Sequence, residues 1–165
     1  MQSSEDAVRP LWAPWRIEFI RSPKNGGCFL CGKKEDFNSP EETLVIFRGK
    51  HMFVILNRYP YNSGHLMVAP YRHIGDISEL DADEQAELMT LTIKSECVLK
   101  SLMRPDGFNI GFNLGIAAGA GVADHIHQHI VPRWIGDTNF MPVLGGSRVV
   151  PEALEDTARL IRANW

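Results

Sequence analysis

The chain has 165 residues, of which 44% are hydrophobic and 22% are charged, and its formal net charge is −3 at pH 7. This length fits one ordinary domain, and the apolar content is too high for an intrinsically disordered protein. The slight acidic excess argues against a broad nucleic-acid surface, so an anionic ligand must be bound locally. No stretch approaches the roughly 20 consecutive apolar residues that span a bilayer, and the N-terminus lacks a signal-peptide pattern. We therefore expect a cytoplasmic protein that binds neither membranes nor nucleic acid.

The first 27 residues show neither a helical nor an alternating pattern. They carry Trp12 and Trp15 among prolines and charged side chains and close on a pair of glycines. We interpret residues 1–27 as an arm whose aromatic side chains pack on the body of the protein or on a second subunit.

Three β-rich runs bounded by turn-forming residues follow, at 43–47, 52–56 and 65–69. The first two are separated by Arg48-Gly49-Lys50-His51, which predicts a hairpin, and the third stops at Pro70. Three neighbouring strands with short connections predict an antiparallel sheet.

A long helix is predicted next. Asp81 is followed three residues later by Glu84, which is a capping pattern. Apolar residues then recur at helical spacing until Pro105-Asp106-Gly107 interrupts them, so the helix covers about residues 82–103.

The remaining elements complete the predicted fold. Alternation over 108–114 predicts a strand with one apolar face, and a Gly/Ala-rich loop over 115–121 leads into a last strand, 125–131, ended by Pro132. A short helix is expected from Pro151, since proline is favoured in the first turn of a helix. The chain is therefore predicted to be α+β, with an antiparallel sheet of about five strands, one long helix and a C-terminal helix.

Three of the six histidines, His125, His127 and His129, alternate with other residues in the last predicted strand. Alternate side chains of a strand point to one face, so the three histidines form a row. Structural histidines are the alternative, but each of three buried histidines would need its own partners and add little packing. Because His125 and His129 would lie about 13 Å apart, they cannot share one metal ion.

This row suits chemistry at phosphorus. A neutral histidine can attack an electrophilic phosphorus, and a second one on the same face can hold the phosphate oxygens or assist the leaving group. The preceding loop, with Gly119 and Gly121, leaves backbone N–H groups uncovered for an anion. The pattern favours phosphoryl or nucleotidyl transfer.

The segment His125-Ile126-His127-Gln128-His129-Ile130-Val131 resembles the histidine-triad signature, in which three histidines alternate with mostly apolar residues. Residues 62–73, which contain a Pro-x-x-His segment, and the strand leading to Asn113 fall in the order of that family. Residues 11–16 and 132–142 further resemble a bacterial branch similar to diadenosine polyphosphate hydrolases and phosphorylases. The chain then divides into the arm 1–27, a histidine-triad catalytic domain 28–143 and a C-terminal helical extension 144–165.

The resemblance implies a role for several residues. His127 would be the nucleophile that forms a covalent nucleotidyl-histidine, which water or phosphate then resolves. His129 would contact the phosphate and help the leaving group depart, His65 would line the same pocket, and Asn113 would bind the phosphate or orient the site. The expected base and ribose neighbours at the first strands are Phe47, Leu56, Asn57 and Arg58.

The chain departs from the family pattern in two places. Gln128 stands where the second spacer is usually apolar, and Gly121 and Val122 stand where many hydrolases of the family have Gln and Ser or Thr. Backbone donors are therefore expected to replace side-chain phosphate contacts. Because the third triad position is His129 rather than glutamine, the chain is less similar to the branch that includes galactose phosphate uridylyltransferases.

Cys28-x-x-Cys31 can place two thiolates on one metal ion, and a closed tetrahedral zinc site needs two more ligands. Resemblance to zinc-binding members of the family implies that these are His73 and His125. Two reduced cysteines in a surface turn are the alternative. A redox pair is disfavoured, because no helix follows closely enough to lower a thiol pKa.

Four other residues receive structural interpretations. We interpret Cys97 as a small buried hydrophobe and His51 as an exposed residue without a role. Trp134 and Phe140 have rings on which an adenine can stack, but we interpret both as core or interface residues.

The sequence thus favours a nucleotidyl hydrolase or phosphorylase acting on an adenine-containing nucleotide, preferably diadenosine tetraphosphate, with structural zinc and no organic cofactor. Nucleoside phosphoramidates and acyl adenylates share the same α-phosphate and stay open as substrates. A metallohydrolase with a catalytic zinc on His125 and His127, and a nucleotide-binding protein without turnover, are the alternatives from other classes. Because members of the family commonly pair through the long helix and its neighbouring strand, we also expect a homodimer or a higher homo-oligomer.

Overall fold

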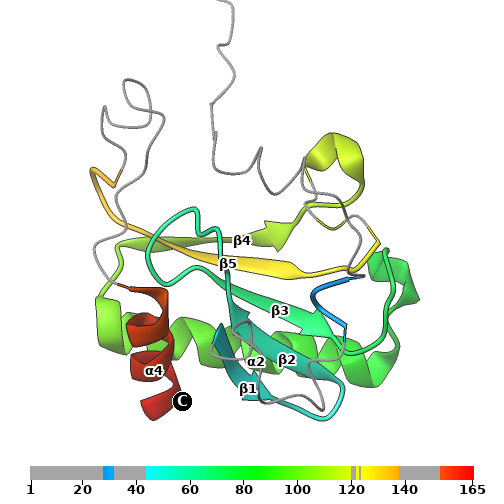
Figure 1. The fold of residues 1–165 in the computed structure, drawn as a ribbon, viewed down its shortest axis with the longest axis horizontal. Helices are drawn as coiled ribbons and strands as arrows, with labels where there is room; N and C mark the ends of the chain where they lie inside the picture. The colour runs from blue at the N-terminus through cyan, green and yellow to red at the C-terminus, as the bar shows by residue number, and fades with distance from the viewer. Residues whose placement is uncertain (1–27, 32–43, 120–121, 123, 138–152) are drawn as a thin grey trace, which may run out of the picture.

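The structure is a computed structural model that describes residues 28–31, 44–119, 122, 124–137 and 153–165. Five antiparallel strands form one sheet in the order β1-β2-β3-β5-β4 (Figure 1). The strands are β1 (Val45–Arg48), β2 (Met52–Leu56), β3 (Leu66–Pro70), β4 (Gly107–Phe112) and β5 (Gln128–Arg133). The α+β class and the five-stranded antiparallel sheet are confirmed.

Helices complete the described elements: α2 (Ala82–Met103), α4 (Leu154–Ala163) and the short 3-10 helices η2 (Ile77–Glu79) and η3 (Ile116–Ala118). Helix α2 packs on β2, β3 and β5, and it lies behind the strands in Figure 1, whereas α4 packs on β1 and α2. No helix among the described residues is long and apolar enough to cross a lipid bilayer.

Some predicted features fall on residues that the structure does not describe. Residues 1–27, Gly121, Phe140 and Pro151 lie outside the described residues, although the C-terminal helix itself is confirmed. The division of the chain into an arm, a catalytic domain and an extension stays a prediction.

Helix α2 begins and ends where the sequence predicted. The N-cap Asp81 accepts a hydrogen bond from the Glu84 backbone at 2.8 Å, and the Glu84 carboxylate accepts one from the Asp81 backbone at 3.0 Å. The helix stops at Arg104, whose φ of 48° is left-handed, directly before Pro105. Local side-chain chemistry therefore sets both ends of the helix.

Strand pairing assigns the central residues to the two faces of the sheet. Met67 and His129 are cross-strand partners and share one face, while Val68 and Gln128 share the other. The Thr92 hydroxyl of α2 donates to the Gln128 carboxamide oxygen, so α2 covers the second face. His129 therefore lies on the face of the sheet away from α2.

The last strand differs from its prediction at both ends. It begins at Gln128, because the backbone of the preceding segment bonds elsewhere: the Ile126 N–H donates to the Ile74 carbonyl at 2.7 Å. It also continues through Pro132 to Arg133. The pairing with β3 ends at Ile130, whereas the pairing with β4 continues to Pro132, opposite Phe108, and to Arg133.

The interpretations of Cys97 and His51 are wrong. Cys97 is exposed, because it lies on the solvent side of α2 in line with Met89 and Ile93, which are 57% and 53% exposed. His51 is half-buried in the β1–β2 turn, where its backbone N–H donates to the Glu87 carboxylate at 2.7 Å. Because the Glu87 carboxylate binds the backbone of this turn, His51 is not at an exposed loop tip.

Candidate active site

His127 lies in the segment directly before β5 and is 8% exposed. Its Nδ1 lies 2.8 Å from the carbonyl oxygen of His125. Since a carbonyl oxygen only accepts, Nδ1 carries the proton, and the neutral ring keeps its lone pair on Nε2. His127 is thereby held in the form in which Nε2 is a nucleophile.

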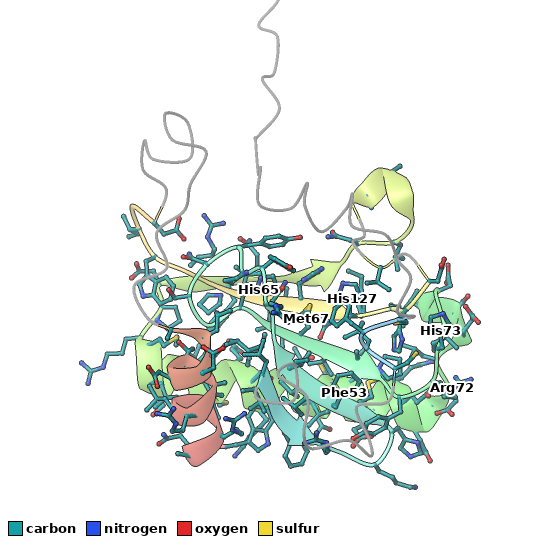
Figure 2. All side chains as sticks on the ribbon, viewed as in Figure 1. Phe53, His65, Met67, Arg72, His73 and His127 are labelled. Carbon is teal, nitrogen blue, oxygen red and sulfur yellow. The ribbon has the colours of Figure 1, made fainter. Side chains whose placement is uncertain are left out.

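Two more histidine rings lie beside His127. The His129 ring centroid is 4.9 Å from that of His127, with the rings inclined at 74°, and His65 Nε2 lies 2.9 Å from His129 Nδ1. His65 and His129 are both buried. Figure 2 shows His65 and His127 over the middle of the sheet near Met67. We call His65, His127 and His129 the histidine cluster.

Amide groups surround the His65–His129 pair. The Tyr61 backbone N–H donates to His65 Nδ1 at 3.0 Å, and Asn57 Nδ2 lies 3.4 Å from the same nitrogen. The Asn113 carboxamide lies 3.4 Å from His129 Nε2. The structure therefore brings the predicted residues His65, Asn57 and Asn113 together with His129.

Cys28, Cys31, His73 and His125 form a second cluster, which we call the cysteine–histidine cluster. One ligand atom from each lies within 4.8 Å of every other. The Nδ1 of His125 is 3.3 Å from Cys28 Sγ and 3.6 Å from Cys31 Sγ, while the Nδ1 of His73 is 3.2 Å from Cys31 Sγ. In tetrahedral zinc sites the bond lengths put sulfur and nitrogen ligands about 3.6 Å apart. The four residues therefore fit a zinc ion.

The protonation of this cluster also suits a metal ion. His125 Nε2 lies 2.8 Å from the Pro70 carbonyl oxygen and must donate, so Nδ1, which faces the sulfurs, has a free lone pair. Burial, assisted by His73 and His127, lowers the pKa of His125 despite the opposing bond to Pro70. Burial and the neighbouring Cys28 raise the pKa of the Cys31 thiol, so metal binding must displace its proton.

A catalytic metal shared by His125 and His127 does not fit this geometry. His125 uses one ring nitrogen toward Pro70 and turns the other toward the sulfurs of Cys28 and Cys31. His127 uses Nδ1 toward the His125 carbonyl. The first triad histidine therefore belongs to the cysteine–histidine cluster, and the other two belong to the histidine cluster.

Other predicted residues lie farther out. Phe47 stacks on Trp165 with ring centroids 5.4 Å apart, on the outer strand β1, and two strands separate it from β5. Leu56 is 1% exposed and belongs to the core, while Arg58 is exposed. Gly119 has a φ of 81°, and nothing lies within 4 Å of the position that a Cβ would take. The structure therefore does not bring Phe47 or Leu56 to the histidine cluster.

Trp134 has a structural contact. Its indole Nε1 donates to the Met103 carbonyl oxygen at 3.3 Å, at the C-terminal end of α2. This contact agrees with the interpretation of Trp134 as a packing residue.

Three further residues, Tyr61, Asn62 and Asp137, lie at the site without having been predicted. The Tyr61 ring packs against both His65 and His129, with centroid distances of 4.6 and 5.5 Å. The Asp137 carboxylate, 8% exposed, accepts from Asn62 Nδ2 at 2.8 Å. The sequence signal that could have indicated Tyr61 is an aromatic residue among the turn-forming residues between β2 and β3.

A family model for the HIT domain matches residues 38–134. The chain belongs to the HIT domain family. It is 43% identical to an AP-4-A phosphorylase from Mycobacterium tuberculosis over 97% of this chain and 86% of that protein. It is also 32% identical to an asymmetrical bis(5'-nucleosyl)-tetraphosphatase from Schizosaccharomyces pombe over 57% of this chain and 51% of that protein.

Solved HIT structures share this fold. A Zn-bound histidine triad family protein from Mycobacterium smegmatis is 30% identical, with a TM-score of 0.60 over 73% of this chain and 82% of that chain. The resemblance to the histidine-triad family is therefore confirmed. The sequence match to that family includes both the histidine cluster and the helix and strands that position it.

Proposed function

We propose that this HIT protein transfers a nucleotidyl group through a covalent intermediate on His127. The observation that carries the proposal is the bond from His127 Nδ1 to the His125 carbonyl, which leaves Nε2 able to attack phosphorus. In the first step a bond forms between His127 Nε2 and the α-phosphorus, and the bond from that phosphorus to the polyphosphate oxygen breaks. His129, beside His127, contacts the phosphate and assists the departing oxygen.

We propose diadenosine tetraphosphate as the substrate and inorganic phosphate as the acceptor. The support is the 43% identity to an AP-4-A phosphorylase over nearly the whole chain. Attack at an α-phosphorus leaves adenylyl-His127 and releases ATP, and a phosphate oxygen then displaces His127 to give ADP. Water as the acceptor would give AMP and define a hydrolase. Phosphoramidates and acyl adenylates are the alternative substrates.

Five residues besides the histidine cluster are proposed to bind the substrate. Asn113 is placed to hold phosphate oxygens, since its carboxamide lies 3.4 Å from His129 Nε2. The backbone of Gly119, whose φ is 81°, is proposed as a second phosphate contact. Asn57, beside His65, is proposed to contact the ribose. Gly121 and Phe47 stay proposals without a described contact to the cluster.

We propose that Cys28, Cys31, His73 and His125 hold a structural zinc ion. Its support is the separation of the four ligand atoms together with the orientation of His125 Nδ1. A bound zinc ion would supply a rigid link between the Cys28–Cys31 turn and the segment that leads to His127. The backbone bond between Ile126 and Ile74 already ties that segment to the loop of His73.

The surface supports the expected homodimer. Met89 and Ile93 of α2 and Ile110 of the edge strand β4 are 57%, 53% and 43% exposed. Large exposed apolar side chains on a helix and on the edge strand of a sheet are typical of a surface that a second copy covers. A cytoplasmic location and independence from membranes and nucleic acid remain our expectation.

Product analysis tests the proposed reaction. Purified protein is incubated with diadenosine tetraphosphate, with and without inorganic phosphate, beside a His127→Ala control, and the nucleotides are separated by chromatography. ATP and ADP formed only with phosphate would support the phosphorylase. AMP and ATP formed without phosphate would identify a hydrolase, and no cleavage in either condition would overturn the substrate assignment.

A further inference from the structure

A backbone amide donates a hydrogen bond to the His65–His129 pair. The Tyr61 N–H donates to His65 Nδ1 at 3.0 Å. A ring nitrogen that accepts cannot itself carry a proton, so the proton of a neutral His65 must be on Nε2. The Asn57 amide at 3.4 Å from the same Nδ1 is a second donor and favours the same tautomer.

The tautomer of His65 determines that of His129. His65 Nε2 lies 2.9 Å from His129 Nδ1, so it donates its proton to that nitrogen. His129 Nδ1 then has to accept, and the proton of a neutral His129 is on Nε2. The Asn113 carboxamide, whose Nδ2 lies 3.4 Å from this Nε2, then has to turn its oxygen toward the N–H. Protonating Nδ1 as well would set two buried N–H groups against each other, which is unfavourable at a buried site.

The connection between β2 and β3, which carries Tyr61, is held by several hydrogen bonds. Asn62 Nδ2 donates to Asp137 at 2.8 Å and to the Pro132 carbonyl at 3.2 Å. The Arg133 guanidinium binds both carboxylate oxygens of Asp137, at 2.6 and 2.9 Å. The Tyr61 ring covers His65 and His129 from the same side. Asp137 and Pro132 thus anchor Asn62, the residue next to Tyr61, at the end of β5.

We infer that Tyr61 is a positioning residue whose backbone N–H, acting through His65, holds His129 as a neutral ring that offers Nε2–H to the substrate. In this form His129 stabilises charge on a phosphoryl or leaving oxygen by hydrogen bonding without giving up a full proton. Polyphosphate leaves as a weakly basic anion and tolerates this arrangement, whereas an amine leaving group must be protonated. The inference rests on the proposed function and narrows its substrate class to phosphoanhydrides.

Nitrogen NMR reads the tautomers directly and needs no turnover. Protein labelled with ¹⁵N-histidine is recorded in long-range ¹H–¹⁵N correlation spectra at pH 7, with His65→Gln and His129→Gln used to assign the two rings. The expected result is a neutral ring with Nε2 protonated for both residues. A protonated Nδ1 on His129, as either the other tautomer or the imidazolium, would overturn the inference even if the proposed reaction occurs.

Two substitutions at one position isolate the amide. Tyr61→Ala and Tyr61→Pro both remove the ring, but only the proline removes the N–H. We expect kcat for diadenosine tetraphosphate to fall about tenfold further in Tyr61→Pro than in Tyr61→Ala, with KM changed little, because one fixed donor is lost. Only Tyr61→Pro should show mixed tautomers on His65. Equal kcat values and equal spectra in the two folded variants would contradict the inference. If Tyr61→Pro does not fold, the tautomers in the wild-type spectrum decide whether the inference holds.

The substrate class gives an independent reading. The wild-type protein should cleave diadenosine tetraphosphate at least about 100-fold faster, by kcat/KM, than an adenosine phosphoramidate with an alkylamine leaving group, given the usual size of general-acid effects. A phosphoramidate cleaved as fast would overturn the neutral-donor assignment while leaving the covalent mechanism intact. Cleavage of neither substrate would overturn the proposed function instead, and the tautomer spectrum would still stand.

Discussion

Zinc binding by the cysteine–histidine cluster should determine a large part of the stability of this protein. The perturbation is Cys31→Ser, which removes the sulfur that lies 3.2 Å from His73 Nδ1 and 3.6 Å from His125 Nδ1. Serine keeps the size of the side chain but is not a ligand that zinc prefers. The remaining three residues form an incomplete tetrahedron, so the affinity for zinc should fall steeply.

The magnitude follows from mass action. Zinc present at about 1,000 times its Kd stabilises the folded state by about 4 kcal/mol, provided that the unfolded chain does not bind it. For a chain of this size each kcal/mol changes Tm by about 2–4 °C, so zinc should raise Tm by about 8–16 °C. The Cys31→Ser variant should lack most of this increment.

Scanning calorimetry of metal-depleted protein with graded zinc, together with metal analysis, measures both quantities. Wild-type protein should hold one zinc ion per chain and show the rise in Tm. Cys97→Ser is the matched control, because Cys97 is exposed on α2 and lies outside the cluster. The reasoning is refuted if wild type and Cys31→Ser gain the same Tm from zinc, or if wild type binds no zinc at all.

Two further substitutions test how the fold holds the site. Glu84→Gln should lower the free energy of unfolding by about 1–3 kcal/mol, because Glu84 is 2% exposed and accepts two bonds from Arg72 at 2.7 Å. Arg72 lowers the pKa of Glu84 against the effect of burial, so this stability is present above the ordinary glutamate pKa of about 4.3 and is lost as pH falls below it. Urea unfolding at several pH values measures the difference, and a difference independent of pH would count against the ion pair. Gly64→Ala should lower the free energy of unfolding by about 1–2 kcal/mol, because φ at this position is 73°, in the left-handed region. The contact of the new Cβ with Met103 Sδ, at 2.6 Å, should add to this loss. An unchanged urea midpoint for Gly64→Ala would contradict this prediction and show that the turn before His65 adapts to the new side chain.

Local sequence patterns were sufficient to predict several elements of the fold. The capping box of Asp81 and Glu84 and the break at Pro105 involve neighbouring residues only, so both ends of α2 could be predicted. The row of alternating histidines likewise led to the segment that carries the candidate active site. Its detailed geometry could not be predicted, because the Ile126 backbone bonds to Ile74 and β5 begins only at Gln128.

Long-range contacts explain the features that the sequence did not reveal. Phe47 was expected beside the nucleotide, but it is stacked on Trp165, which lies at the far end of the chain. Tyr61 acts through a main-chain group that no side-chain pattern identifies. The alternation of His125, His127 and His129 predicted one row, whereas the contacts of Cys28 divide that row between two clusters.

The covalent intermediate is the central claim, and trapping it is the most direct test. Wild-type protein is mixed with diadenosine tetraphosphate without inorganic phosphate, quenched and examined by mass spectrometry. The account predicts one adenylyl group on His127, one equivalent of ATP released per site, and discharge of the adenylyl group as ADP when phosphate is added. His127→Ala should show none of these. Nucleotide cleavage that persists in His127→Ala, or that proceeds in wild type without an adenylyl group on His127, would contradict the account.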